Sequence, residues 1–187
     1  MMIDLCNKLV DNDLTKKDLL ERVEIQRTTE EDFDNICKTL AKAFDLESPG
    51  EAAMQLIYSH VLIDESIKLA DKDNGDIYGL LMFCEYPISI GSPLVNINKN
   101  IAEFLDKFKQ VNGHSFVIDE RLRGVGLDRK MLFHNIQYLA KNYDMIWIGV
   151  EESLKSHNYW QRLGFVRIFD IPEAVFYMFP FNEKLIS

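Results

Sequence analysis

The sequence predicts a single α/β domain built on a mixed sheet, on three observations. Segments in which apolar and polar residues alternate, or which are wholly apolar, are typical of strands. They are interleaved along the chain with segments of helical periodicity. An Asn-Gly pair joins two neighbouring apolar runs, which is typical of an antiparallel hairpin. The later strands are separated by helices, which favours parallel pairing.

Size, composition and charge exclude several classes of protein. The 187 residues suit one domain, and 47% of them are hydrophobic and 27% charged, as in soluble globular proteins. The net charge of −9 argues against nucleic acid as a partner. Cys6, Cys37 and Cys84 are too far apart for a zinc site, and no apolar stretch is long enough for a membrane span. We expect a cytoplasmic protein without a metal or a membrane partner; a homodimer is compatible with the sequence.

The first half of the chain predicts helices around a small antiparallel sheet. Thr28-Thr29-Glu30-Glu31 is an N-cap signal for a helix, and Pro49-Gly50 is expected to break the chain before the next one. Asn74-Gly75 is the expected hairpin turn. The predicted helices are 14–21, 33–44 and 52–62, and the predicted strands are 23–27, 67–70 and 77–83.

The second half alternates helices and strands. Residues 86–98 contain two prolines and are expected to form a loop, followed by a helix with an apolar stripe of Ile101, Phe104, Leu105 and Phe108. Strands at 115–118 and 145–150 enclose a helix at 127–142. A short helix at 156–163 precedes a last hairpin of strands 165–169 and 174–179.

The turn between strand 115–118 and helix 127–142 has the properties of an anion-binding cradle. The first N–H groups of a helix lack partners, and the helix dipole favours negative charge there. Gly124 and Gly126 allow close approach of a phosphate, and Arg121 and Arg123 would add charged donors. A Walker A loop is excluded because Gly-Lys-Ser/Thr is missing, and the dinucleotide fingerprint is excluded because Arg129 replaces its third glycine.

Two segments resemble the GNAT N-acetyltransferase family. Arg121-Leu122-Arg123-Gly124-Val125-Gly126 matches the family's acetyl-CoA loop, Arg/Gln-x-x-Gly-x-Gly/Ala. Downstream, Tyr159-Trp160-Gln161-Arg162-Leu163-Gly164-Phe165 is similar to the family's aromatic pair followed by Leu-Gly-Phe. A helix and an apolar strand separate the two signatures, as they do in the family.

The resemblance implies the organisation of the chain and a cofactor site. It implies a GNAT-like mixed sheet with antiparallel N-terminal strands and parallel fourth and fifth strands, an N-terminal helical extension (1–22), a GNAT-like domain (23–180) and an insertion (86–109) walling the acceptor site. Acetyl-CoA would bind between the splayed fourth and fifth strands. The residues implied to bind it are Phe116, Val117, Ile118, Arg121, Leu122, Arg123, Gly124, Val125, Gly126, Leu127, Ser153, Ser156, Tyr159 and Trp160.

Two positions depart from the family pattern. Relatives often present a tyrosine, as the acid for the leaving thiolate, where Trp160 stands, and an asparagine where Ser153 stands. Tyr159 is one residue away, and one residue turns a helix by about 100°. An indole N–H can donate a hydrogen bond to a thiolate but has no proton to give near neutral pH.

The candidates for the general base are His114 and Glu85. Relatives often carry the base on the fourth strand, an odd number of residues before the first Arg or Gln of the loop. His114 lies seven residues before Arg121, so strand alternation would place it on the same face as the base of those relatives; the alternative is a hydrogen-bonded histidine at the strand edge. Glu85 follows the hairpin strand and is otherwise a solvated carboxylate. Asp119 and Glu120 are expected to cap the loop, and His157 is a candidate substitute acid.

The implied function is transfer of an acetyl group from acetyl-CoA to a primary amine, on a small molecule or a peptide, by direct attack. One alternative is a non-catalytic acyl-CoA-binding or sensor module of the same fold. Another is an interaction domain in which the glycine segment is only a turn.

Overall fold

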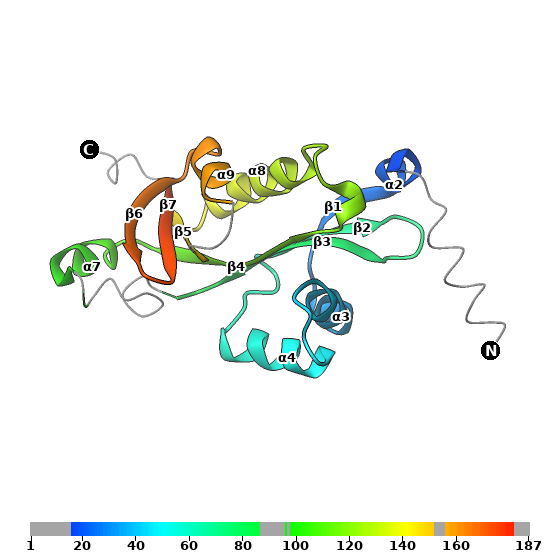
Figure 1. Cartoon of the computed structure of the whole chain (residues 1–187), viewed down its shortest axis with the longest axis horizontal. Coiled ribbons are helices and arrows are strands. Elements are labelled where there is room, and N and C mark those ends of the chain that lie inside the picture. Colours follow the sequence, from blue (N-terminus) through cyan, green and yellow to red (C-terminus); the bar gives the residue numbers. More distant parts are fainter. Residues whose placement is uncertain (1–15, 87–95, 97, 152–155, 182–187) are drawn as a thin grey trace.

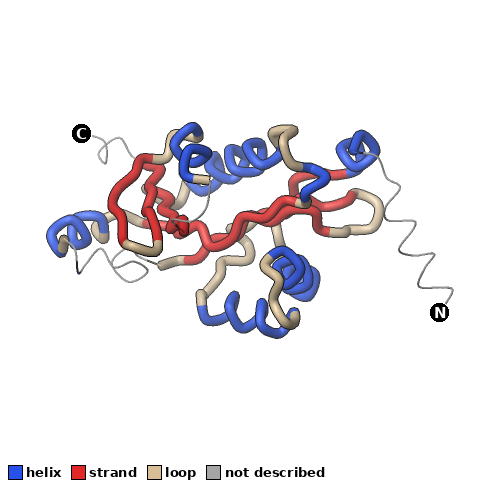
Figure 2. Tube along the Cα trace, in the orientation of Figure 1, coloured by secondary structure: helices blue, strands red, loops and turns tan. Residues whose placement is uncertain are grey.

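The computed structural model describes residues 16–86, 96, 98–151 and 156–181. These residues form one seven-stranded sheet in the order β1-β2-β3-β4-β5-β7-β6. Helices cover both faces of the sheet, as Figures 1 and 2 show. The strands are β1 (Val23–Arg27), β2 (Ile67–Asp71), β3 (Ile77–Cys84), β4 (Gln110–Ile118), β5 (Met145–Glu151), β6 (Val166–Ile171) and β7 (Ala174–Pro180).

The strand pairing confirms the predicted mixed sheet. Strands β1 to β4 are antiparallel neighbours, β4 and β5 are parallel, and β5, β7 and β6 are again antiparallel. The β2–β3 hairpin turns at Asn74-Gly75, where Gly75 has a φ of 77°, the left-handed region that glycine enters at little cost. This is the turn that the Asn-Gly pair predicted.

The helices form two layers (Figure 1). Helices α8 (Leu127–Leu139) and α9 (His157–Arg162) lie on one face, which we call the α8 face; α3 (Phe33–Ala43) and α4 (Pro49–Tyr58) lie on the other, the α3 face. Helix α7 (Lys99–Leu105) packs against β5 and β7 on the α3 face, while α2 (Lys16–Arg22) lies beside β1. Two 3-10 turns, η1 (Glu30–Asp32) and η2 (Glu120–Leu122), precede α3 and follow β4.

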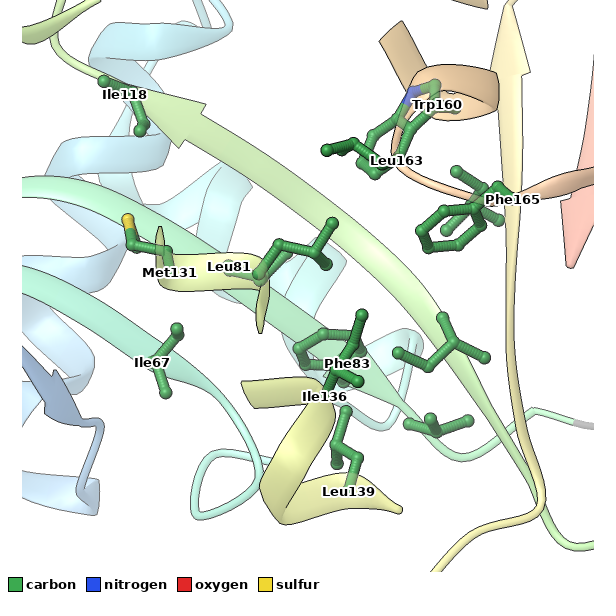
Figure 3. Packing of buried hydrophobic residues seen from close by; sticks show 14 of the residues in the cluster. Ile67, Leu81, Phe83, Ile118, Met131, Ile136, Leu139, Trp160, Leu163 and Phe165 are labelled. Carbon is green, nitrogen blue, oxygen red and sulfur yellow. The ribbon is translucent and has the colours of Figure 1, made fainter. Parts of the chain in front are cut away.

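The core is divided between the two faces by strand alternation. In β3, Leu81 and Phe83 pack in the cluster of the α8 face, while Leu80 and Met82 pack against α3 and α4. Figure 3 shows the first cluster, where Met131, Ile136 and Leu139 of α8 lie over β3 and β2. A third cluster joins α7 to β5 and β7 through Trp147 and Phe176.

Three details of the predicted elements are wrong. Pro49 begins α4 rather than breaking the chain, because its missing N–H is not needed at the first helical position and the Ser48 side chain caps Glu51 N. Helix α7 buries Ala102 and Leu105, while Ile101 and Phe104 are 43% and 47% exposed. Strand β4 begins at Gln110, five residues before the predicted start, because both neighbouring strands pair with its polar first half.

Among the described residues, no helix is both long and apolar enough to cross a membrane.

Candidate functional site

A cleft opens where the two parallel strands separate. β4 and β5 are paired only from Gln110 with Met145 to Gly113 with Ile148, although β4 runs on to Ile118 and β5 to Glu151. Figure 3 shows the two strands diverging, with Trp160 in the space between them in this view. The resulting cleft has a volume of about 450 Å³. Its lining is Phe44, Leu81, Phe83, Gly113, His114, Ser115, Phe116, Leu132, Ile146, Ile148, Gly149, Val150, Glu151, Ser156, Tyr159, Trp160 and Phe165.

The two ends of the cleft differ in chemistry because neighbouring residues of a strand face opposite sides of the sheet. Ile146, Ile148 and Val150 of β5 belong to the cluster of the α8 face, so Gly149 and Glu151 face the α3 side. Lining residues on the α8 side are apolar or aromatic except Ser156 and the Tyr159 hydroxyl. The α3 side carries His114, Ser115 and Glu151, with Phe44 at the end of α3. The cleft is therefore an apolar channel that ends in a polar chamber.

A β-bulge places His114 in that chamber. Met82 pairs with Ser115 and Phe83 with Gly113, so His114 is an extra residue in β4. The strict period-two alternation on which the predicted face of His114 depends is therefore broken. His114 nevertheless lines the cleft, and its Nδ1 lies 2.8 Å from Ser115 Oγ. Burial lowers the pKa of His114 below its ordinary value of 6.5, so the ring is neutral at pH 7.

The glycine turn lies beyond the other end of β4. Gly124 and Gly126 have φ values of 76° and 79°, and a Cβ built on either would meet no heavy atom within 4 Å. Helix α8 makes its first backbone hydrogen bond from Lys130 N to Gly126 O, at 3.0 Å. The N–H groups of residues 127–129 precede that bond and have no partner within the helix. The backbone thus forms an open, donor-rich cradle.

The two arginines of the turn are held by the protein itself. Arg121 donates from Nε and Nη2 to the Asp119 carboxylate at 2.9 and 3.0 Å, and this pairing holds the pKa of Asp119 below its ordinary range. Arg123 donates from Nε to Ile118 O at 3.0 Å. Asp119 also accepts from Arg121 N, so the expectation that it caps the turn is confirmed.

Helix α9 presents two aromatic side chains to the cleft. Trp160 is 9% exposed and contacts Phe116 and Phe165, with ring centroids 5.9 and 5.2 Å away. Tyr159 packs edge-on against Trp160 and also lines the cleft, although a turn of about 100° separates the two positions. Burial, then the nearby Asp128 carboxylate at the start of α8, raises the pKa of Tyr159. The tyrosine hydroxyl is thus directed toward the cradle.

The remaining predicted site residues lie at different places in the structure. Glu85 is exposed and is not among the described residues that line the cleft. Leu122 is buried and Val117 packs toward α3, so either could meet a ligand only through its backbone. His157 contacts the Tyr177 hydroxyl at 3.1 Å. Ser153 and residues 1–15 of the predicted extension lie outside the described residues.

Within the predicted insertion (86–109), no described residue lines the cleft. Its helix α7 packs instead against β5 and β7, through Ala102 and Leu105. Sequence reasoning missed Ser115 and Phe44 as lining residues. No motif marks Ser115, although it alternates with Val117 and so faces the α3 side, and Phe44 is only the last apolar residue of the predicted helix 33–44.

No protein-family model matches the sequence, and no curated protein matches it. Solved structures do. The Escherichia coli GNAT family N-acetyltransferase YhbS, in complex with CoA, is 20% identical with a TM-score of 0.62, over 89% of this chain and 85% of that one. The Escherichia coli ribosomal-protein-S18-alanine N-acetyltransferase is 15% identical with a TM-score of 0.58, over 86% and 94%. Arylalkylamine N-acetyltransferase 2 from Aedes aegypti is 15% identical with a TM-score of 0.57, over 86% and 99%. The chain therefore has the GNAT N-acetyltransferase fold.

Proposed function

We propose that this protein transfers an acetyl group from acetyl-CoA to a primary amine. The observation that carries the proposal is the cleft between the diverging β4 and β5, which joins the polar chamber around His114 to the side of the sheet that holds the glycine cradle. The CoA complex of YhbS, a protein of the same fold, supports CoA as the ligand.

The residues of the cradle fit the diphosphate of acetyl-CoA. No heavy atom lies within 4 Å of the position that a Cβ would take at Gly124 or Gly126, so a phosphate can approach the backbone there. The first N–H groups of α8 have no partner within the helix, and a helix N-terminus favours negative charge. The apolar lining of Phe116, Ile148 and Trp160 would hold the uncharged arm of the cofactor and exclude water. The bound cofactor supplies an activated acyl thioester; the protein has to orient it and prepare the amine.

Preparing the amine is the task that we assign to His114. An amine with an ordinary pKa of about 10.4 needs about 4.6 kcal/mol to lose its proton at pH 7, so a base is useful. If Nδ1–H donates to Ser115 Oγ, Nε2 carries the lone pair that accepts the amine proton. The buried ring is already neutral and available for this role. Glu85 lies outside the cleft lining and stays the second candidate.

The acceptor would enter from the α3 side. Phe44 offers an apolar surface there, and Glu151 at the end of β5 offers a negative charge that suits a cationic amine. The attack would form the C–N bond as the C–S bond breaks, and the amine proton would pass to His114. A free amine on a small molecule or at a peptide terminus satisfies these features equally.

One observation favours a non-catalytic alternative. Trp160 stands where relatives have an acidic tyrosine, and the hydroxyl of Tyr159 is directed toward Asp128 at the start of α8. A module that only binds acyl-CoA would keep the cradle and lose the acid. Release of free thiol from acetyl-CoA, measured across a panel of amines and peptides with the protein at micromolar concentration, separates the two functions. Amine-dependent thiol release supports the enzyme, and tight binding without release supports the module.

A further inference from the structure

The positive charge near the cradle has an unexpected source in the N-terminal helix α2. Arg121, the first residue of the glycine motif, is bound through two nitrogen atoms to Asp119, so a carboxylate offsets its charge. Lys16 of α2 lies at the same turn, and its Nζ donates to the backbone carbonyl of Arg123 at 2.8 Å. Arg123 immediately precedes Gly124, where the open cradle begins. An ammonium group from outside the motif therefore lies beside the phosphate cradle.

The position of Lys16 is fixed by the packing of its helix. Leu19 of α2 is fully buried in the same apolar cluster as Leu122 of η2, which is 1% exposed. At the other end of α2, Arg22 forms a 2.7 Å ion pair with Asp71, and Lys72 donates to the Glu21 carbonyl at 2.8 Å. Figure 1 shows α2 beside the segment that leads into α8. A helix held at both ends presents its first lysine to the turn with little entropic cost.

We propose that Lys16 is a phosphate-binding residue of the CoA site. The inference rests on the proposed function, because it assumes that CoA occupies the cradle. A lysine ammonium has three donors, and one of them is used by the Arg123 carbonyl, so the others are available to phosphate oxygens. The diphosphate and the 3′-phosphate of CoA present the same chemistry, and a truncated ligand tells them apart.

The test is calorimetric titration of the full chain with CoA and with dephospho-CoA, which lacks the 3′-phosphate. Lys16→Gln is compared with Lys17→Gln, which removes the same charge one position along the exposed side of the helix. Lys16→Gln should weaken CoA binding by roughly three- to tenfold, as a partly solvated charge-assisted contact allows. Lys17→Gln should change it by less than about twofold, and Lys16→Arg should retain most of the affinity.

The pattern across the two ligands identifies the phosphate. A loss for CoA alone assigns Lys16 to the 3′-phosphate, and an equal loss for both ligands, with a shallower salt dependence, assigns it to the diphosphate. An unchanged affinity for both ligands overturns the inference. So does an equal loss in Lys16→Gln and Lys16→Arg with the salt dependence of the parent, since this would show that Lys16 only tethers the turn. These outcomes differ from failure of the proposed function, in which the parent protein itself binds neither ligand.

Discussion

The cradle and the chamber, at the two ends of the cleft, are built in different ways. The cradle is made by backbone: two glycines in the left-handed region and the first N–H groups of a helix. The chamber is made by side chains, from β4, β5 and the end of α3, that meet because a bulge turns His114 toward them. A site made of backbone groups is formed by contiguous residues, so its motif can be recognised even at low sequence identity. A site of side chains from separate elements leaves no such pattern.

The largest expected effect is at the cradle. Gly126→Val should reduce acetyl-CoA affinity by at least about 100-fold, because a branched Cβ would fill the space that the diphosphate needs. Valine at a φ of 79° also strains the backbone. Gly75→Val is the matched control, since Gly75 has a φ of 77° and equally open surroundings but lies in the β2–β3 turn. Calorimetry measures the acetyl-CoA affinity of both variants. Equal affinities in Gly126→Val and Gly75→Val would show that the cradle does not bind the cofactor.

At the chamber, the effect should appear in rate rather than in binding. His114→Gln should lower turnover by about 10²-fold or more, the usual contribution of a general base, and leave acetyl-CoA affinity within about threefold. Because burial lowers the pKa of His114, the rate of the parent should rise with pH through a midpoint below 6.5. The variant should lack that limb.

The control for this experiment is His134→Gln, which changes an exposed histidine of α8. Its pH–rate profile should coincide with that of the parent. If the profile of His114→Gln also coincides with the parent's, the base lies elsewhere, and Glu85→Gln becomes the variant to measure.

A smaller effect is expected where cradle and chamber meet, at Trp160. Trp160→Tyr should change turnover by less than about tenfold, because a CoA thiol is already a fair leaving group. Trp160→Ala should weaken cofactor binding and destabilise the fold by about 3 kcal/mol or more, since this buried ring packs against Phe116 and Phe165. Steady-state kinetics and urea unfolding provide the two readouts. A gain of several orders of magnitude in Trp160→Tyr would show that the natural protein lacks a required acid.

The smallest effect concerns stability. The unfolded chain binds a proton at His114 with an ordinary pKa near 6.5, whereas the folded protein binds it less well. The free energy of unfolding should therefore fall as pH drops below about 6.5, by at most ~1.4 kcal/mol per pH unit from this residue. Urea unfolding at pH 7.5 and 5.5 should show a smaller pH-dependent loss in His114→Gln than in the parent. Equal losses in the two proteins would contradict the buried, neutral ring.

Much of the fold was predictable because local patterns and long-range pairing agree. The Asn74-Gly75 hairpin is confirmed, and so is β1 at residues 23–27. The errors occur where tertiary contacts decide. The first half of β4 has weak strand character in sequence, yet it is paired on both sides. The predicted stripe of α7 is right for the buried Leu105 but wrong for the exposed Ile101 and Phe104, because the helix buries Ala102 instead.

The site was predictable where the sequence resembles a family motif, at the glycine cradle and at Phe116, Tyr159 and Trp160 of the cleft lining. The roles assigned to these residues stay predictions. The bulge depends on the pairing of β4 with β3, so the contact between His114 and Ser115 could not be derived from their order in the chain. The contribution of Lys16 is similarly hidden, because 107 residues separate it from Arg123.

The most direct test of the central claim is a coupled measurement on the parent protein. Acetyl-CoA is titrated first, and thiol release is then followed with primary amines and short peptides, with mass spectrometry of the products. We expect saturable binding that Gly126→Val abolishes, and at least one amine that gains an acetyl group at a rate dependent on His114. Saturable binding with no acetylated product from any acceptor would contradict the transferase and leave an acyl-CoA-binding protein.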